Sequence, residues 1–411
     1  PLMVFKQVNL SIKYGNTSVS SCAYATYGLI LSGETVGDIE TGYQFGQLAL
    51  LLLDNFHAKE LKARTIFIVN YFVKHWKEHL RETLNPLQNA YSIALETGDL
   101  EYAAYAVCVY CYHSYVLGKE LATVEREMAM YSNTLSQLKQ ETSYYYNQLN
   151  RQVLLNLMGQ AEDKCRLIGE SYDETKMLPL HLSANAQNIC HSVYFYKLFL
   201  CYIFQDYQQA IENAKSAEKY SDSAVGTIPL YHFYNSLVHL AIYSDAPKSE
   251  QKLILQKVKA NQKNIKKWAH FAPMTHLHKF YLVEAERYRV LGETTLAIDY
   301  YDRAIALAKE NDYINEEALA NELAAKFYLA WGKEQVAQAY MRNAYYCYLR
   351  WGATAKMTDL KRQYPQLLKR FTTANTSINS RNSLSNTSGS TSGETLDLAA
   401  LMKASQAIAS E

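Results

Sequence analysis

Residues that interrupt helices are scarce in this sequence, which has 16 glycines and 7 prolines in 411 residues. Their scarcity permits long, uninterrupted helices. Long apolar runs are also missing, because the longest strongly apolar stretch is Leu48–Leu53, whereas a transmembrane helix needs about 20 residues. Residues 1–30 lack the basic start, apolar core and cleavage site of a secretory signal. We therefore expect a cytoplasmic protein without a membrane span.

Strong charge of either sign is absent too, since the formal net charge is +1. This balance predicts no broad attraction to nucleic acid or to acidic membranes. The seven cysteines are an odd number, which argues against a complete disulfide framework. Most of them lie in apolar helical runs, as reduced and buried thiols do in a cytosolic protein.

Tyrosine, in contrast, is abundant, with 35 residues against 13 phenylalanines and 4 tryptophans. Its apolar ring and polar tip suit the half-buried seams between stacked helices. A repeat that would create such seams is clearest near the C-terminal end. There Gly292 and Gly332 each end an apolar helical run, and each precedes a small-large-small triplet. The triplets are Ala297, Tyr301, Ala304 and Ala337, Met341, Ala344.

These units predict pairs of antiparallel helices. A glycine makes the tight turn, and the small residues let the second helix approach the first closely. The arrangement matches the tetratricopeptide pattern, whose unit has about 34 residues, although the step here is longer. Fainter copies follow Gly37, Gly98 and Gln205. We therefore predict an all-α superhelix of roughly eight to ten helical hairpins with almost no strand; an irregular helical bundle is the alternative.

Between these units, apolar recurrence at three and four residues predicts helices over four ranges. They are 58–84, 121–157, 230–244 and 248–271. The repeat array is predicted to occupy residues 1–371. Residues 372–395 are nearly all Ser, Thr, Asn and Gly and are predicted to form a flexible linker. Residues 396–411 are predicted to be a helix that leads into a following domain or pairs with a second copy, or else a frayed end.

Motifs for phosphate chemistry are missing. A nucleotide-binding loop needs GxxxxGK[ST], and Gly118-Lys119-Glu120 and Gly332-Lys333-Glu334 lack both the second glycine and the hydroxyl residue. The protein-kinase signatures HRD and DFG are absent as well. We therefore expect no nucleotide site in this segment.

One segment has the residue pattern of a known metal-binding motif. His75-Trp76-Lys77-Glu78-His79 matches HxxEH, in which two histidines on one helix face hold zinc and the glutamate acts as base. Its charged neighbours favour a solvated helix face instead. The Cys108-x-x-Cys111 pair has no second pair for a zinc site, so packed thiols are the preferred interpretation. His270, His276 and His278 are interpreted as lining a turn between helices, because no acidic residue or nucleophile lies at a useful spacing.

A basic segment runs from Lys252 to Lys267. It could meet an acidic partner or nucleic acid. We prefer a solvated helix face, with Leu253, Leu255, Val258, Ile265 and Trp268 turned toward the core.

Two segments carry a family resemblance. The start, VNLSIKYGNTSVSSCAYATYGLIL followed by GDIETGYQFGQLAL and AKELKAR, resembles the helical region after the ATPase domain in very large multi-sensor signal transduction kinases, mainly of cyanobacteria. The end, TLDLAALMKASQAIASE, resembles the lead into a GAF domain in the same family. The resemblance implies a parent with a serine/threonine kinase domain, a STAND-like ATPase and often a histidine-kinase module. None of the family's catalytic residues falls in this chain, so ATP is implied only for the parent.

The sequence thus predicts a piece of a longer signalling protein that senses or binds rather than catalyses. No catalytic, cofactor-binding or metal-binding residue is assigned. The expected partner is a protein or a neighbouring ATPase, kinase or GAF domain, held in a groove formed by the inner helices. Tyr281, Tyr288 and His278 are candidates for that groove, and core packing is the alternative. A structural spacer without a ligand and an all-α hydrolase are the other functional classes considered.

Overall fold

The computed structural model describes residues 1–33, 35–56, 59–221 and 226–368. Within these residues the chain forms eighteen α-helices and no strand, apart from one isolated bridge between Ile168 and Asp173. The prediction of an all-α helical array is confirmed. The predicted linker (372–395) and last helix (396–411) lie outside the described residues.

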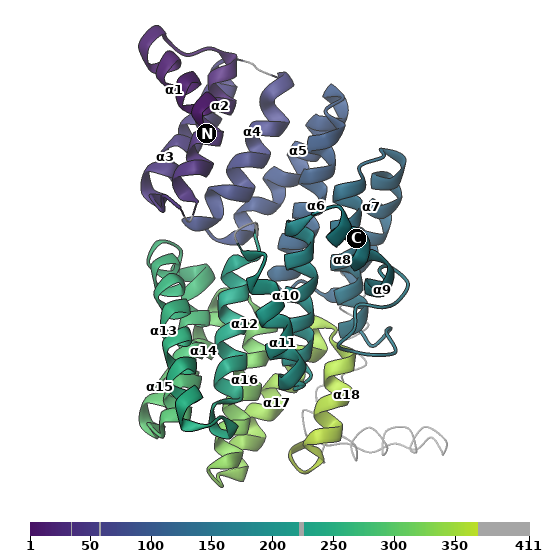
Figure 1. The fold of residues 1–411 in the computed structure, drawn as a ribbon, viewed down its shortest axis with the longest axis vertical. Helices are drawn as coiled ribbons and strands as arrows, with labels where there is room; N and C mark the ends of the chain where they lie inside the picture. Colours follow the sequence, from purple (N-terminus) through teal and green to yellow (C-terminus); the bar gives the residue numbers. More distant parts are fainter. Residues whose placement is uncertain (34, 57–58, 222–225, 369–411) are drawn as a thin grey trace, which may run out of the picture. The chain divides into compact units, whose positions relative to one another are not determined.

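The first part of the array comprises nine α-helices and two short 3₁₀ turns, η1 and η2 (Figure 1). Their bounds are α1 (Leu2–Tyr14), α2 (Ser18–Ser32), α3 (Ile39–Phe56), α4 (Lys59–Phe72), η1 (Lys74–Trp76), η2 (Leu80–Thr83), α5 (Leu84–Thr97), α6 (Leu100–Val116), α7 (Leu121–Gln137), α8 (Glu141–Leu157) and α9 (Glu174–Ser183).

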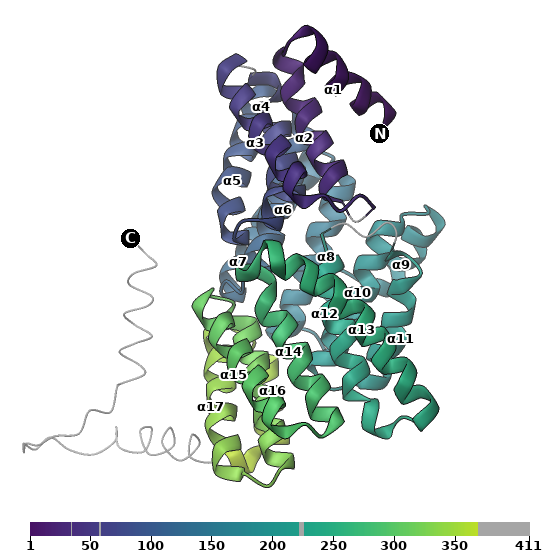
Figure 2. The same cartoon turned by 90° about the vertical axis from the view of Figure 1, so that its left-hand side faces the viewer.

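The second part comprises nine more α-helices and one 3₁₀ turn, η4. Their bounds are α10 (Gln187–Ile203), α11 (Tyr207–Glu218), α12 (Ile228–Ala241), η4 (Tyr243–Asp245), α13 (Lys248–Phe271), α14 (Pro273–Leu291), α15 (Thr294–Glu310), α16 (Ile314–Ala330), α17 (Glu334–Trp351) and α18 (Thr354–Gln363). Figures 1 and 2 show α1–α5 stacked side by side and α10–α17 forming a second stack, with α6–α9 between them.

The hairpin of α14 and α15 shows why this sequence makes helix pairs. Gly292 has φ of +79°, a left-handed conformation that glycine adopts without steric cost, and it ends α14. The residues of the predicted triplet, Ala297, Tyr301 and Ala304, are all buried. Small side chains at the first and third positions let the helices approach, and the Tyr301 hydroxyl donates a hydrogen bond to Glu286 of α14.

Two predicted helices are wrong in extent. The segment 121–157 is a hairpin, α7 and α8, which turns at Lys139 with φ of +54°. Left-handed backbone at a single non-glycine residue is tolerated, and it leaves no glycine to indicate the turn. The segment 58–84 is helical only to Phe72 and continues as η1 and η2, while the segment 248–271 is α13 as predicted.

The basic segment Lys252–Lys267 forms a solvated helix face on α13, which confirms the preferred interpretation. Lys252, Lys259, Lys263, Lys266 and Lys267 are exposed, and Lys257 forms an ion pair with Glu218. Val258, Ile265 and Trp268 are buried as predicted. The prediction that Leu253 faces the core is wrong, because this side chain is 63% exposed and Ile254 is buried instead. In the part of the chain that the structure describes, no helix is both long enough and apolar enough to cross a membrane.

Candidate functional site

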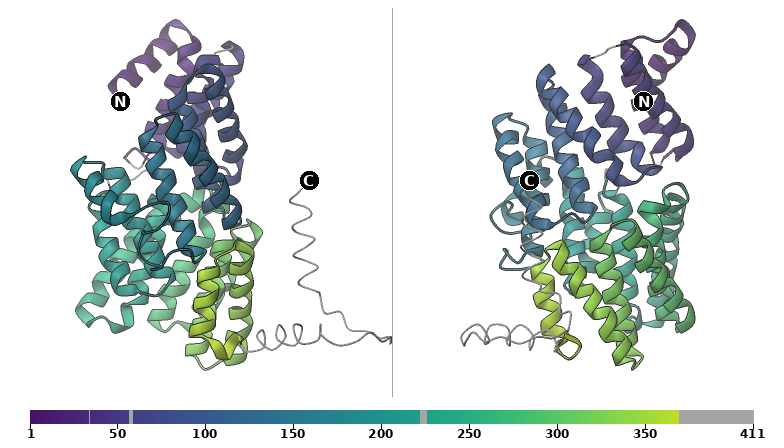
Figure 3. Two further views of the ribbon diagram at one scale, coloured as in Figure 1. Left: turned by 90° about the vertical axis from the view of Figure 1, so that its right-hand side faces the viewer. Right: turned by 180° about the vertical axis from the view of Figure 1, so that it is seen from behind.

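The array turns back on itself, so that helices distant in sequence meet. Asn315, at the start of α16, donates from Nδ2 to the carbonyl oxygen of Val116 at the end of α6, at 3.3 Å. Lys356 of α18 donates from Nζ to the carbonyl oxygen of Ile203 at the end of α10, at 2.6 Å. Figure 3 shows the yellow-green helices α16–α18 close to the ends of the blue helices α6–α8. We call this set of contacts the closure seam.

The seam continues at η2. The Nε2 atom of His79 lies 3.0 Å from the carbonyl oxygen of Asn311, and its ring stacks on Tyr313 with ring centres 5.4 Å apart. Arg81 forms an ion pair of 3.1 Å with Asp312. These contacts join the residues around η2 to the turn between α15 and α16.

A first cavity, which we call the tyrosine chamber, has a volume of about 260 Å³ between α4, α6, α8 and α10. Its walls are chiefly aromatic and include Phe67, Tyr71, Tyr105, Tyr112, Tyr146 and Tyr196. Several wall hydroxyl groups have partners in the protein, among them Tyr105, which donates to Glu101 at 2.9 Å. Tyr196 donates to Oδ1 of Asn150 at 2.6 Å, and Tyr112 donates to the carbonyl oxygen of Gly226 at 3.0 Å. The chamber therefore offers mainly aromatic surface.

A second cavity, which we call the histidine chamber, has a volume of about 690 Å³. Its walls come from α2, α4, η1, η2, α6 and α11–α14, and they include His75, Trp76, His113, His232, His276 and Lys279. Tyr71, Phe72 and Tyr112 line both chambers, so the two cavities adjoin. Residues from η1 and from α14 face the same space, which places this chamber behind the closure seam.

Three imidazoles of the histidine chamber, those of His75, His113 and His276, have a lowered pKa and are neutral at pH 7. Burial lowers the pKa of His75 to about 4 and, with His75 nearby, lowers the pKa of His113 to about 3. Burial also lowers the pKa of His276 well below its usual value, and the Lys279 ammonium lowers it further. A neutral imidazole carries one N–H donor and one acceptor nitrogen, so these three side chains supply both kinds of group without adding positive charge.

His276 has an unusual position among them. Its side chain is 4% exposed, and neither ring nitrogen has a hydrogen-bond partner in the protein. The Oδ1 atom of Asn235, also on the chamber wall, is buried and unpaired as well. A buried polar atom without a partner costs about 1–3 kcal/mol, so these atoms would gain stability from a hydrogen-bond partner.

A buried charged cluster lies beside the chamber. Lys279 Nζ is 2.8 Å from Glu316 Oε2, and His278 Nε2 contacts the same oxygen. Burial raises the pKa of the Glu316 carboxyl, but Lys279 and His278 lower it by more, so the net pKa falls. Neither His278 nor Glu316 lines the histidine chamber. Their interaction holds α14 against α16 and so positions His276 and Lys279.

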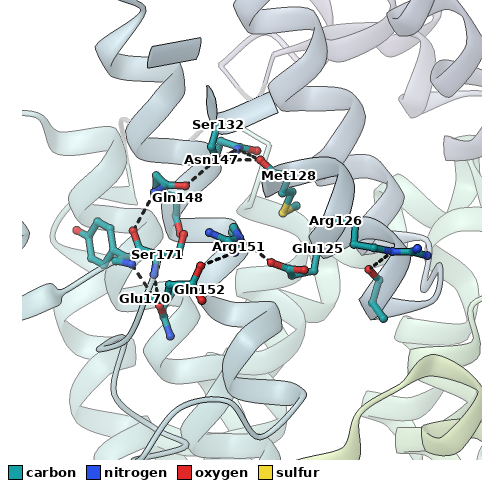
Figure 4. Close-up of polar contacts among 12 residues, drawn as sticks. Glu125, Arg126, Met128, Ser132, Asn147, Gln148, Arg151, Gln152, Glu170 and Ser171 are labelled. Carbon is teal, nitrogen blue, oxygen red and sulfur yellow. Dashed lines mark hydrogen bonds and ion pairs between the residues drawn. The ribbon is translucent and has the colours of Figure 1, made fainter. Parts of the chain in front are cut away.

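The helix α8 is held from its other side by a polar network (Figure 4). The Gln152 side-chain oxygen accepts from the backbone N–H groups of Ser171 and Tyr172 at 3.1 and 3.2 Å. Arg151 pairs with Glu125 of α7 at 2.7 Å. This network fixes the loop after α8 and the α7–α8 hairpin, and α8 in turn presents Tyr146 and Asn150 to the tyrosine chamber.

The HxxEH motif does not form a helix face. His75 belongs to η1, and His79 precedes η2, where its Nδ1 atom accepts from the backbone N–H of Arg81 at 3.1 Å. The preferred interpretation as a solvated helix face is therefore wrong, because α4 ends at Phe72 and His75 is partly buried on the wall of the histidine chamber. The alternative, in which both histidines share one helix face, is wrong for the same reason. In the described residues, no group of three or more His, Cys, Asp or Glu side chains is placed to hold a metal ion.

The other predicted candidates are distributed over several environments. Cys108 and Cys111 are buried free thiols, as preferred, and burial raises the pKa of Cys108 to about 12. Tyr281 and Tyr288 pack against Tyr300 of α15 and line neither chamber. His278 is buried in the charged cluster.

His270 is exposed at the end of α13, and His276 lies in the first turns of α14, as expected for a turn between helices. Sequence reasoning did not identify His276 as part of a cavity, nor Glu316 as the carboxylate beside His278. Both depend on contacts made by the folded array. No local pattern marks either residue, because His276 meets Trp76 and Glu316 meets His278 only in the folded array.

No family model matches the chain. In a comparison with curated proteins, the chain is similar to hybrid signal transduction histidine kinase G of Dictyostelium discoideum. The two are 28% identical over 137 residues, which is 33% of this chain and 4% of that protein. The matched segment is thus a small part of its relative. The similarity relates the chain to a segment of a signalling protein.

Proposed function

We propose that this chain is a non-catalytic sensor and interaction segment of a large multidomain signal transduction kinase. The observation that carries the proposal is the local similarity to a hybrid signal transduction histidine kinase. We further propose that the helical hairpins are of the tetratricopeptide type, and that the segment acts in the cytoplasm between an ATPase-like and a GAF-like module. The resemblance of its two ends to the multi-sensor kinases supports this placement.

The closed array suggests how such a segment would transmit a signal. Trp76 of η1 and His276 of α14 come from elements far apart in the sequence, yet both line the histidine chamber. A molecule or partner that favours one spacing of these elements shifts the equilibrium between arrangements of the array. That shift would reach the modules on either side.

A non-catalytic role is supported by the position of the buried histidine-carboxylate pair. His278 and Glu316 are engaged with Lys279 and with each other, and they line neither chamber. They are therefore placed to stabilise the packing of α14 on α16 rather than to exchange protons with a molecule in the cavity.

The test uses the full-length protein that contains this segment. Asn315→Ala removes the seam hydrogen bond to Val116, and Asn133→Ala removes an exposed amide on α7 as a matched control. We expect Asn315→Ala to change autophosphorylation or its response to a stimulus while the control behaves as wild type. The 411-residue chain should also bind at least one separately produced kinase, ATPase-like or GAF-like module. No such binding, together with identical output of both variants, would indicate a spacer.

A further inference from the structure

The histidine chamber holds polar groups that the protein itself leaves unpaired. Both ring nitrogens of His276 and the side-chain oxygen of Asn235 are buried without a hydrogen-bond partner. The Asn235 Nδ2 atom does have one, because it donates to the Tyr231 hydroxyl at 3.2 Å. A ligand that pairs with the free atoms would need both a donor and an acceptor, since a neutral imidazole supplies one of each.

The same chamber offers flat aromatic surfaces. Trp76 stacks on the His276 ring with centres 6.1 Å apart and planes 28° apart, and it also packs against Trp268 at 5.7 Å. Phe72 and Tyr71 add aromatic surface where the two chambers adjoin. The volume of about 690 Å³ falls in the range of small-molecule sites, which is roughly 300–1,000 Å³. A planar ring system fits these walls.

Among the described residues, two charged side chains line this chamber, and both have a partner of opposite charge. Lys279 pairs with Glu316 at 2.8 Å, and Glu218 pairs with Lys257 at 2.8 Å. A phosphate or carboxylate in the chamber would lose its hydration without gaining a free counter-charge, and burying an unpaired charge is costly. The charge pattern therefore favours a ligand without net charge.

We propose that the histidine chamber binds a neutral, planar nitrogen heterocycle whose ring edge carries both a hydrogen-bond donor and an acceptor. His276 exchanges hydrogen bonds with that edge, Asn235 accepts from it, and Trp76 supports the ring face. This site deepens the proposed function, because the heterocycle would be the stimulus. Binding itself, however, requires only the cavity.

The experiment measures binding to the purified 411-residue chain by calorimetry and by NMR of ¹⁵N-labelled histidine rings. The neutral probes are adenine, pterin and lumichrome. Naphthalene, which has the flat shape without polar edges, and adenosine monophosphate, which adds charge, serve as contrasts. We expect at least one neutral heterocycle to bind and to shift the His276 ring signals, with both contrasts about tenfold weaker or more.

His276→Phe keeps a buried flat ring and removes both nitrogens. We expect it to fold with unchanged or higher thermal stability and to lose at least about tenfold in heterocycle affinity. The matched control is His181→Phe on α9, because His181 is also buried, has an unpaired Nε2 atom and lines neither chamber. This control should bind as wild type does.

The proposal is overturned if none of the neutral heterocycles binds, if binding survives His276→Phe, or if the charged nucleotide binds best. These results are separable from a failure of the proposed function. A change in kinase output on Asn315→Ala, without heterocycle binding, would leave the signalling role standing and remove the ligand site. Heterocycle binding without any effect on output would do the reverse.

Discussion

Gly118 lies against Asn315 so closely that a β-carbon on the glycine would come within 2.7 Å of the Asn315 Oδ1 atom and 3.1 Å of the Ile314 Cγ2 atom. Gly118 also has φ of +73°, in the left-handed region. The turn after α6 is therefore fitted to the start of α16, and the same Asn315 side chain donates to Val116 next to this turn.

Gly118→Ala should lower the free energy of unfolding by about 2–3 kcal/mol, since left-handed strain costs roughly 1–2 kcal/mol and the close contact adds to it. Gly98→Ala is the control, because Gly98 has φ of +75° but no atom within 4 Å of its added β-carbon. Urea denaturation of both variants isolates the contact. Equal losses would mean that the seam accommodates the methyl group without cost.

Lys356→Met should destabilise the chain by about 2–3 kcal/mol, because it removes two buried hydrogen bonds and leaves Lys326, at 2.7 Å, as the remaining cation on Glu322. Lys356 is fully buried and bonds to Glu322 Oε1 at 2.9 Å and to the carbonyl oxygen of Ile203 at 2.6 Å. Lys361→Met, at an exposed position on α18, should change stability by no more than about 0.5 kcal/mol. Thermal and chemical unfolding measure both. If Lys356→Met left the free energy of unfolding unchanged, this part of the seam would not stabilise the fold.

Acidification should weaken the fold before the carboxylates titrate. The unfolded histidines titrate near 6.5, whereas burial lowers the pKa of His75 to about 4 and of His113 to about 3 in the folded chain. The unfolded state therefore binds more protons below pH 6.5, and the free energy of unfolding falls as the pH drops. At pH 5.5 the loss is about 1 kcal/mol for each such histidine.

Denaturant titrations at pH 7 and pH 5.5 check this dependence. His276→Phe should reduce the loss between the two pH values by about 1 kcal/mol, because it removes one of the buried imidazoles whose pKa is lowered. Unchanged stability across this interval would show that the imidazoles are protonated or solvated in the folded protein.

Gln152→Leu should free the loop between α8 and α9. The Gln152 side chain holds the backbone N–H groups of Ser171 and Tyr172 and also donates to Asn156 at 2.9 Å. We expect a loss of about 2–3 kcal/mol and faster proteolysis at residues 160–170. Gln137→Leu, at an exposed site on α7, is the control. Cleavage at the wild-type rate would contradict the role of Gln152.

The helix pairs could be predicted because their determinants are local. The turn at Gly292 and the buried residues Ala297, Tyr301 and Ala304 lie within fifteen positions of one another. Their spacing follows the helical period of about 3.6 residues, so the sequence alone indicates a helix pair. The α7–α8 hairpin was missed because Lys139 adopts a left-handed conformation that any sequence scan attributes to glycine.

The candidate site could not be predicted for a different reason. Trp76 and His276 line the same chamber, and Asn315 bonds to Val116 across 199 residues. These contacts depend on the small rotation from each hairpin to the next, which accumulates along the array. No residue pattern encodes that rotation directly, so the HxxEH pattern relates His75 to its sequence neighbour His79 and not to His276.

The closure seam also fixes the copy number of the hairpins. In an open solenoid each unit touches only its neighbours, so a pair of helices can be gained or lost during evolution with modest effect. Here the turns after α6, α8 and α10 must meet α16 and α18, through contacts such as Asn315 to Val116, Thr354 to Met158 and Lys356 to Ile203. An inserted hairpin between them would shift every one of these pairs out of register. Homologous segments should therefore vary in their loops and keep the number of helices between α6 and α18 constant.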